Sequence, residues 1–147
     1  MRPVSSVTLR SLLDEPTLQL RAIHLPEAAL DREVRWVTAT ELVDPSHLLG
    51  DELILTLGSA WLDPDSPDID RFVESIGLGG GSAVGIALGF EHEQMPRRLV
   101  AAARRFGVPL LEVIRGTTFR SIGEHVVERI AKDRYVAVQQ DVDAYEE

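Results

Sequence analysis

Three segments from residue 52 onward are nearly continuous runs of apolar residues, each of strand length. They cover 52–57, 83–88 and 109–114, and such runs are typical of strands that are buried on both faces. Segments with helical periodicity lie between and after them, so the order from residue 52 is strand, helix, strand, helix, strand, helix. This order predicts an α/β fold, with a mostly parallel sheet covered by helices in a three-layer α/β/α arrangement.

The helices predicted after residue 52 have local start signals. The sequence at 66–68 combines a hydroxyl cap, a proline at the first helical position and an acid in the first turn. The apolar positions that follow are spaced i, i+3, i+4 and i+7: Ile69, Phe72, Val73 and Ile76. A second helix is predicted over 96–106. The final helix is long and begins near Thr118 or Ser121, where Ser121 and Glu124 have the spacing of a capping box.

The first third of the chain has weaker signals. Thr8 is placed to cap a short helix, and the segments 18–23 and 34–38 alternate as half-buried strands do. We expect these two strands either to extend the sheet or to form a small antiparallel flap. Residues 45–49 are expected to form a short helical turn.

Composition limits which binding partners and which cellular compartment we expect. A chain of 147 residues with 44% hydrophobic and 27% charged residues is long enough for one α/β domain. Fifteen basic against 24 acidic residues give a net charge of −9. This charge repels phosphate backbones and anionic membranes, so we expect no direct nucleic-acid binding by this domain and no membrane contact. The absence of cysteine excludes disulfides and thiolate metal sites. With no signal peptide or membrane-spanning run, the expected location is the cytoplasm.

Polar side chains gather around the ends of the two predicted strands 34–38 and 52–57. They are Thr38, Glu41, Asp44, Thr56, Gly58 and Ser59. Strand ends that carry hydroxyls, carboxylates and a glycine are where α/β proteins commonly bind small molecules. These six residues are therefore the predicted ligand-binding site. Glu41 and Asp44 suit a donor-rich metabolite, such as a ureide or a purine, better than a polyanion, because unpaired carboxylates repel phosphate.

No residue set in the sequence indicates catalysis, a metal or a cofactor. The glycine-rich segment 77–82 follows a helix and opens a strand, the reverse of a phosphate-binding loop. The four histidines are scattered, and His92, between two glutamates, is interpreted as a solvated loop residue. We therefore expect a receptor rather than an enzyme, without metal or cofactor. Trp36 is expected in the core and Trp61 partly exposed.

A set of short motifs runs along the chain from about Val7 to about Val127. Trp36-Val37 precedes Glu41-Leu42 and Asp44-Pro45, and Gly50-Asp51-Glu52-Leu53 precedes Leu55-Thr56 and Gly58. The block 106–113 follows in the same order. In these motifs the chain resembles the N-terminal sensory domain of PucR-type bacterial transcriptional regulators. One departure is Leu57, where the family pattern usually has a second threonine, so one hydroxyl is missing from the expected site.

The resemblance implies a regulatory role. It implies a sensory domain over 1–118, followed over 119–147 by a C-terminal helix and an acidic tail that lead towards downstream domains absent from this chain. In such regulators a C-terminal helix-turn-helix binds DNA, and the sensory domain responds to a small metabolite of purine catabolism or of another nitrogen or carbon pathway. The alternative is a ligand-free module for protein interaction and dimerisation in the same regulator.

The final helix carries more apolar residues than one packing face needs. One stripe consists of Phe119, Ile122, Val126 and Ile130, and a neighbouring face carries Val127, Ala131 and Val138. We therefore predict a homodimer whose interface is formed at or beside Ile122, Val126, Val127, Ile130, Ala131 and Val138. The alternative is a helix packed fully on its own domain.

Overall fold

The computed structural model describes residues 7–45 and 48–145. Its helices are α1 (Leu9–Asp14), α2 (Asp68–Leu78), α3 (Arg97–Phe106) and α4 (Phe119–Tyr145), with a short 3-10 helix at Glu27–Ala29. Its strands are β1 (Leu20–His24), β2 (Trp36–Ala39), β3 (Glu52–Thr56), β4 (Ala83–Ala87) and β5 (Leu110–Val113). The predicted alternation from residue 52 is confirmed. The helical turn expected at 45–49 includes residues 46–47, which lie outside the described residues.

The five strands form one sheet in the order β1-β5-β4-β3-β2. Strands β2 to β5 are parallel to one another and adjacent in chain order, while β1 pairs antiparallel with β5. Both early strands therefore extend the sheet at its two edges, which decides between the two arrangements expected from the sequence. The fold is α/β with a mostly parallel sheet, as predicted.

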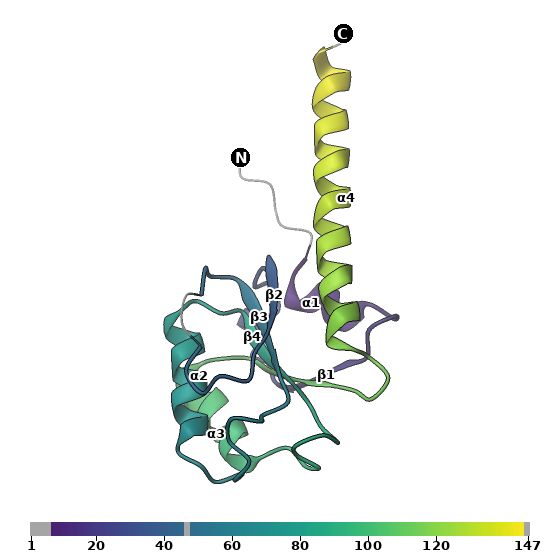
Figure 1. Cartoon of the computed structure of the whole chain (residues 1–147). Coiled ribbons are helices and arrows are strands. Elements are labelled where there is room, and N and C mark those ends of the chain that lie inside the picture. Colours follow the sequence, from purple (N-terminus) through teal and green to yellow (C-terminus); the bar gives the residue numbers. More distant parts are fainter. Residues whose placement is uncertain (1–6, 46–47, 146–147) are drawn as a thin grey trace.

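Side chains of β3 alternate between two cores, one on each face of the sheet. Ile54 packs with residues of α2 and α3, whereas Leu53 and Leu55 pack with residues of α1 and α4. Figure 1 shows the same division, with α2 and α3 over one face and α1 and the first turns of α4 over the other. The apolar runs of the sequence thus correspond to strands that are buried on both faces.

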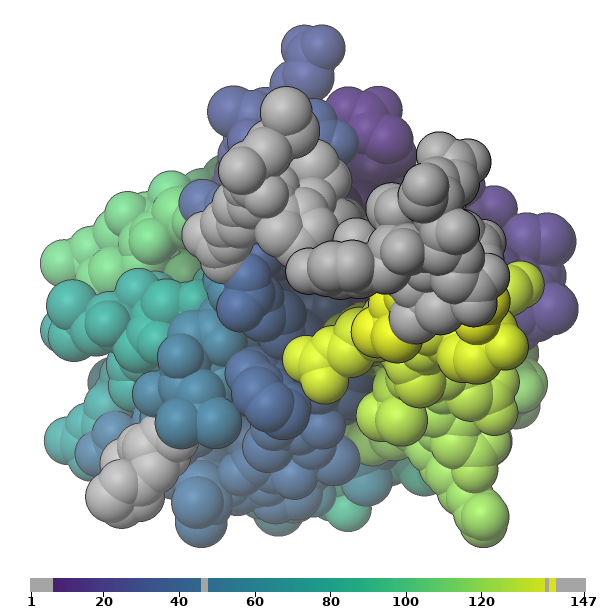
Figure 2. Space-filling view, turned by 90° about the horizontal axis from the view of Figure 1, so that it is seen from above, coloured from purple at the N-terminus to yellow at the C-terminus, as the bar shows by residue number. Residues whose placement is uncertain are grey.

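Helix α4 packs on the body through its first turns. Thr118 and Ser121 begin it with reciprocal side-chain to backbone hydrogen bonds, so Thr118 is the cap and the predicted pairing of Ser121 with Glu124 is wrong. Ile122 and Val126 are buried against the sheet. The rest of the helix runs past the sheet (Figure 1), and Figure 2, seen from above, shows its far part at one side of the body. With 27 residues, α4 is about 40 Å long.

Three aromatic side chains differ from the sequence-based expectation. Trp36 is 50% exposed because β2 is an edge strand, with a neighbouring strand on one side only. Trp61 is 2% exposed, since the loop after β3 places it on Phe72 with ring centroids 5.7 Å apart. His92, expected in solvent, is 5% exposed and its ring centroid lies 5.1 Å from that of Trp61. The edge position of β2 decides the exposure of Trp36, and contacts with residues outside their own segments bury Trp61 and His92.

Glu52, the first residue of β3, is a buried acid with an incomplete set of partners. It is 3% exposed. Its Oε2 accepts a hydrogen bond from the backbone N–H of Leu49 at 2.5 Å, whereas its Oε1 is buried and has no hydrogen-bond partner in the described part of the chain. The acceptor role stabilises the fold, while the desolvated charge destabilises it.

Replacing Glu52 by Gln or by Ala separates these two effects. Glu52→Gln keeps an acceptor for Leu49 and removes the buried charge, so we expect a free energy of unfolding within about 1 kcal/mol of wild type, or higher. Glu52→Ala leaves the Leu49 N–H without its acceptor and should lower the free energy of unfolding by about 1–3 kcal/mol. Urea unfolding at neutral pH measures both. Equal losses in the two variants would show that the charge itself is required.

Candidate functional site

Glu41 joins the ends of β2 and β3. It follows β2 closely, and its carboxylate accepts three hydrogen bonds from the residues that end β3. Thr56 Oγ1 donates to Oε1 at 3.0 Å, the backbone N–H of Ser59 donates to Oε1 at 2.9 Å, and the backbone N–H of Leu57 donates to Oε2 at 2.9 Å. These charge-assisted bonds hold the Glu41 side chain in one place although the residue is exposed.

The hydroxyl of Thr56 has a fixed direction. Thr56 is 1% exposed, and its Oγ1 accepts a hydrogen bond from the backbone N–H of Gly58 at 3.0 Å. Because a hydroxyl both donates and accepts, this arrangement leaves the hydrogen of Thr56 to point at Glu41. Thr56 therefore links the turn after β3 to the carboxylate.

Gly58 shapes this turn. Its φ of 78° lies in the left-handed region, which glycine adopts without strain. Its carbonyl oxygen lies 3.1 Å from Nε2 of His92, and since a carbonyl only accepts, Nε2 carries the hydrogen in this contact. A Cβ on Gly58 would lie 2.7 Å from Cδ2 of His92 and 2.8 Å from the ring of Trp61. The turn is thus enclosed by His92 and Trp61.

The structure brings four of the six predicted site residues together: Glu41, Thr56, Gly58 and Ser59. Thr38 is exposed on the edge strand β2. Within the described residues, no hydrogen bond joins Thr38 or Asp44 to the other four. The predicted site therefore consists of one connected cluster and two separate positions.

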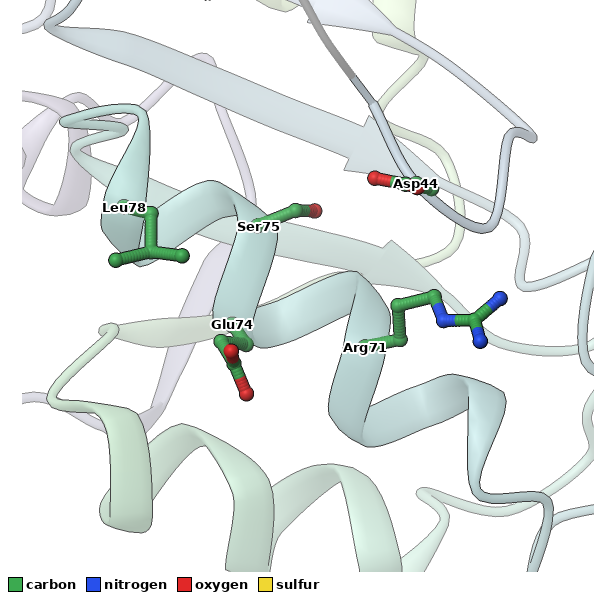
Figure 3. Close-up of a pocket in the computed structure, with 5 residues that line it drawn as sticks. All are labelled: Asp44, Arg71, Glu74, Ser75 and Leu78. Carbon is green, nitrogen blue, oxygen red and sulfur yellow. The ribbon is translucent and has the colours of Figure 1, made fainter.

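Asp44 lines an open pocket of ≈ 350 Å³ between the β2–β3 connection and α2. The other lining residues all come from α2: Arg71, Glu74, Ser75 and Leu78. Figure 3 shows Asp44 on the connecting segment, with Ser75 and Arg71 on the side of α2 that faces this segment. The pocket presents a hydroxyl and charges of both signs to solvent.

The sheet topology places no switch point among strands β2 to β5. In open α/β sheets a crevice forms where successive connections leave towards opposite faces. Here β2 to β5 follow one another in order, and Leu48 of the β2–β3 connection packs in the same core as α2 and α3. The connections therefore leave towards one face, and the loops after β3 and β4 meet through His92 and Gly58.

His92 and Trp61 are site residues that sequence reasoning missed. His92 stands between Glu91 and Glu93, and Trp61 precedes a polar loop, and both contexts are typical of solvent-exposed positions. Their burial follows from contact between the loop after β3 and the loop after β4. Local sequence carries no signal for this contact.

The predicted interface residues of α4 fall into two groups. Ile122 and Val126 are 0% and 1% exposed, and Ile130 packs partly buried against the same core. Ile122 and Val126 have no surface left for a partner, so we remove them from the predicted interface. The second group is exposed: Val127, Ala131 and Val138.

Two kinds of feature are absent from the described residues. No group of three or more His, Asp or Glu side chains there is arranged to hold a metal ion. Over the same ranges, no helix is both long enough and apolar enough to cross a membrane.

The fold and the cluster define a small α/β domain with a polar turn at its strand ends and a helix that leaves the body. Residues 11–130 match the purine catabolism regulatory protein-like (PucR) family, so the chain belongs to this family. It is 30% identical over 136 residues to the transcriptional activator PmfR of Paenarthrobacter nicotinovorans. The match covers 90% of this chain and 28% of that relative. The family and the relative are regulators of transcription rather than enzymes. No solved structure matches the chain.

Two glycine substitutions test how the turn is built. Gly58 and Gly107 both have positive φ, but a Cβ would meet His92 and Trp61 at Gly58 and nothing within 4 Å at Gly107. Gly107→Ala should therefore lower the free energy of unfolding by about 1–2 kcal/mol, the backbone term alone. Gly58→Ala should lower it by about 1–3 kcal/mol more, because the two rings must move.

Urea unfolding and tryptophan fluorescence measure this difference. Fluorescence emission should shift to longer wavelength in Gly58→Ala, because Trp61 becomes more exposed to water. It should stay unchanged in Gly107→Ala. Equal losses of stability and equal spectra in the two variants would contradict the packing described around Gly58.

Proposed function

We propose that this chain is the effector-sensing domain of a PucR-type transcriptional regulator. In this proposal it binds a small metabolite of purine catabolism or of another nitrogen or carbon pathway, and it relays the binding to a DNA-binding domain outside this chain. Family membership and the similarity to a transcriptional activator support the regulatory part. The proposed metabolite site comprises Thr38, Glu41, Asp44, Thr56, Gly58 and Ser59.

The polar turn after β3 is the observation that carries this proposal. Donors from the end of β3 converge there on the exposed carboxylate of Glu41, and the open pocket at Asp44 lies further along the same connecting segment. The buried Thr56 and the enclosed Gly58 hold these groups in place before any ligand arrives. Such preorganisation lowers the entropy lost on binding.

Contacts between β2 and α4 support the relay. Helix α4 packs against β2, and Val37 of β2 contacts the core that contains Ile122 and Val126 of α4. The same strand leads directly into Glu41. A ligand that moves the end of β2 therefore acts on residues in contact with the helix that leaves the body.

A thermal-shift screen of purine-pathway and nitrogen metabolites tests the effector site. At a hundredfold excess over its dissociation constant, a specific ligand should stabilise the domain by about 2.7 kcal/mol. Asp44→Ala should lose most of this shift and keep the melting curve of the free protein, because Asp44 is exposed. Asp14→Ala, which changes an exposed acid of α1, is the matched control. An effector that binds Asp44→Ala as tightly as wild type would exclude Asp44 from the site.

Dimerisation through α4, the alternative role, has its own support. Val127, Tyr135 and Val138 are 68%, 69% and 60% exposed. At 100° per residue, these three and Ala131 fall within about 80° of one another, on the side of the helix away from Ile122 and Val126. A contiguous exposed apolar stripe of this kind is typical of an interaction surface. We propose that two copies associate along it.

Charge placed on the stripe should separate the two copies without unfolding either. Val127→Glu with Ala131→Glu is expected to yield a folded monomer, because an unpaired charge is costly at an interface. Val126→Glu, one position away and 1% exposed, should instead unfold the domain. Light scattering reports mass and circular dichroism reports folding. A strictly monomeric wild type at high concentration would remove the dimer proposal.

A further inference from the structure

The three donors that hold Glu41 form a complete binding site for a carboxylate. The hydroxyl of Thr56 and the backbone N–H groups of Leu57 and Ser59 approach its two oxygens at 3.0, 2.9 and 2.9 Å. Charge-assisted bonds of this length are among the stronger ones in proteins. In this structure the protein supplies the carboxylate itself.

The donors are positioned by contacts that do not involve Glu41. Thr56 belongs to β3 and pairs with β4 in the sheet, and its hydroxyl is oriented by the N–H of Gly58. The carbonyl of Gly58 is held by His92, which packs on Trp61. The site should therefore keep its shape when the carboxylate leaves.

Glu41 is free to leave, because its own segment is largely exposed near this end. Glu41 is exposed, Leu42 is 63% exposed, and Asp44 is exposed. The Glu41 side chain can therefore move into solvent. A carboxylate from solvent can then approach the three donors in its place.

We propose that this turn is a carboxylate-binding site that Glu41 occupies in the free protein, and that a small carboxylic acid effector displaces Glu41 to bind there. This inference rests on the proposed sensing function and names the chemical class of the effector. It replaces the donor-rich class expected from the sequence, because three protein donors already bind the Glu41 carboxylate. Glu41 then acts as a competitor that sets the affinity, and its release frees the segment that follows β2. Two of the three donors are backbone groups, so the site does not depend on a second threonine at Leu57.

Chemical rescue with acetate tests the site without knowledge of the effector. Glu41→Ala removes the equivalent of one acetate, and the amide signals of Leu57 and Ser59 in 15N-labelled protein report on the two backbone donors. We expect both signals to move in Glu41→Ala and to return towards their wild-type positions as sodium acetate is added, with saturation. Acetamide at the same concentration, with sodium chloride to match ionic strength, should have no such effect.

The competitor role predicts an order of half-saturation concentrations. A group tethered by a short segment has an effective concentration of millimolar or more, so acetate should act on wild type at a concentration at least about tenfold higher than on Glu41→Ala. Glu41→Gln, which offers a neutral acceptor of the same length, should lie between them. Asp14→Ala, an exposed acid of α1 outside the proposed site, should behave as wild type.

Two outcomes would overturn the proposal: no saturable return of the two signals in Glu41→Ala, or equal half-saturation in Glu41→Ala and wild type. If the amide signals of Leu57 and Ser59 broaden beyond detection in Glu41→Ala, Glu41→Gln takes its place. No saturable return of its signals, or the same half-saturation concentration of acetate as wild type, would then overturn the proposal. An effector that binds while acetate fails would remove the carboxylate site and leave sensing intact. Acetate rescue without any effector from the metabolite screen would support the site and count against the sensing function.

Discussion

The carboxylate of Glu41 is the contact that closes the exposed end of this sheet. The parallel pairs β3–β4 and β4–β5 are each joined through a helix, which buries apolar surface and fixes the connection. No helix is found in the described part of the β2–β3 connection. Two acids hold its ends instead: Glu41 binds the turn after β3, and Glu52 binds the N–H of Leu49. Polar contacts at its two ends and the packing of Leu48 against the core of α2 and α3 hold this connection.

The order of the strands has a second consequence. Because α2, α3 and the β2–β3 connection share one face of the sheet, the other face is left to the elements at the two ends of the described chain, α1 and α4. Helix α4 covers β2 on that face before it leaves the body. Strand β2 therefore contacts α4 on one face and leads, just after its end, to Glu41 and the turn after β3.

Along α4, burial and exposure separate two faces of one helix. Ile122 and Val126 pack in the core of the domain, whereas Val127 and Val138 are exposed on another side. In the proposed dimer, this exposed side is the one that a second copy covers.

The sequence by itself determined the elements whose signals are local. Apolar runs of a few residues predict the strands β3 and β4. The buried face of α2 follows from the spacing of Ile69, Phe72 and Ile76, and the end of α3 follows from the glycine after it. The family motifs, which are also local, indicated the class of protein that the comparisons show. The predicted strand ends, rather than these motifs, placed Glu41 and Thr56 at one site, because both residues follow or end neighbouring predicted strands.

Only the tertiary structure decided which groups meet at that site. Glu41 meets Thr56 across 15 positions and Gly58 meets His92 across 34, and these pairings depend on strand order and on where each loop crosses the sheet edge. The same dependence buried Trp61 and His92 and exposed Trp36 on an edge strand. Hydrogen-bond partners and edge positions are set by the register and order of strands, and the pattern of a single segment contains neither.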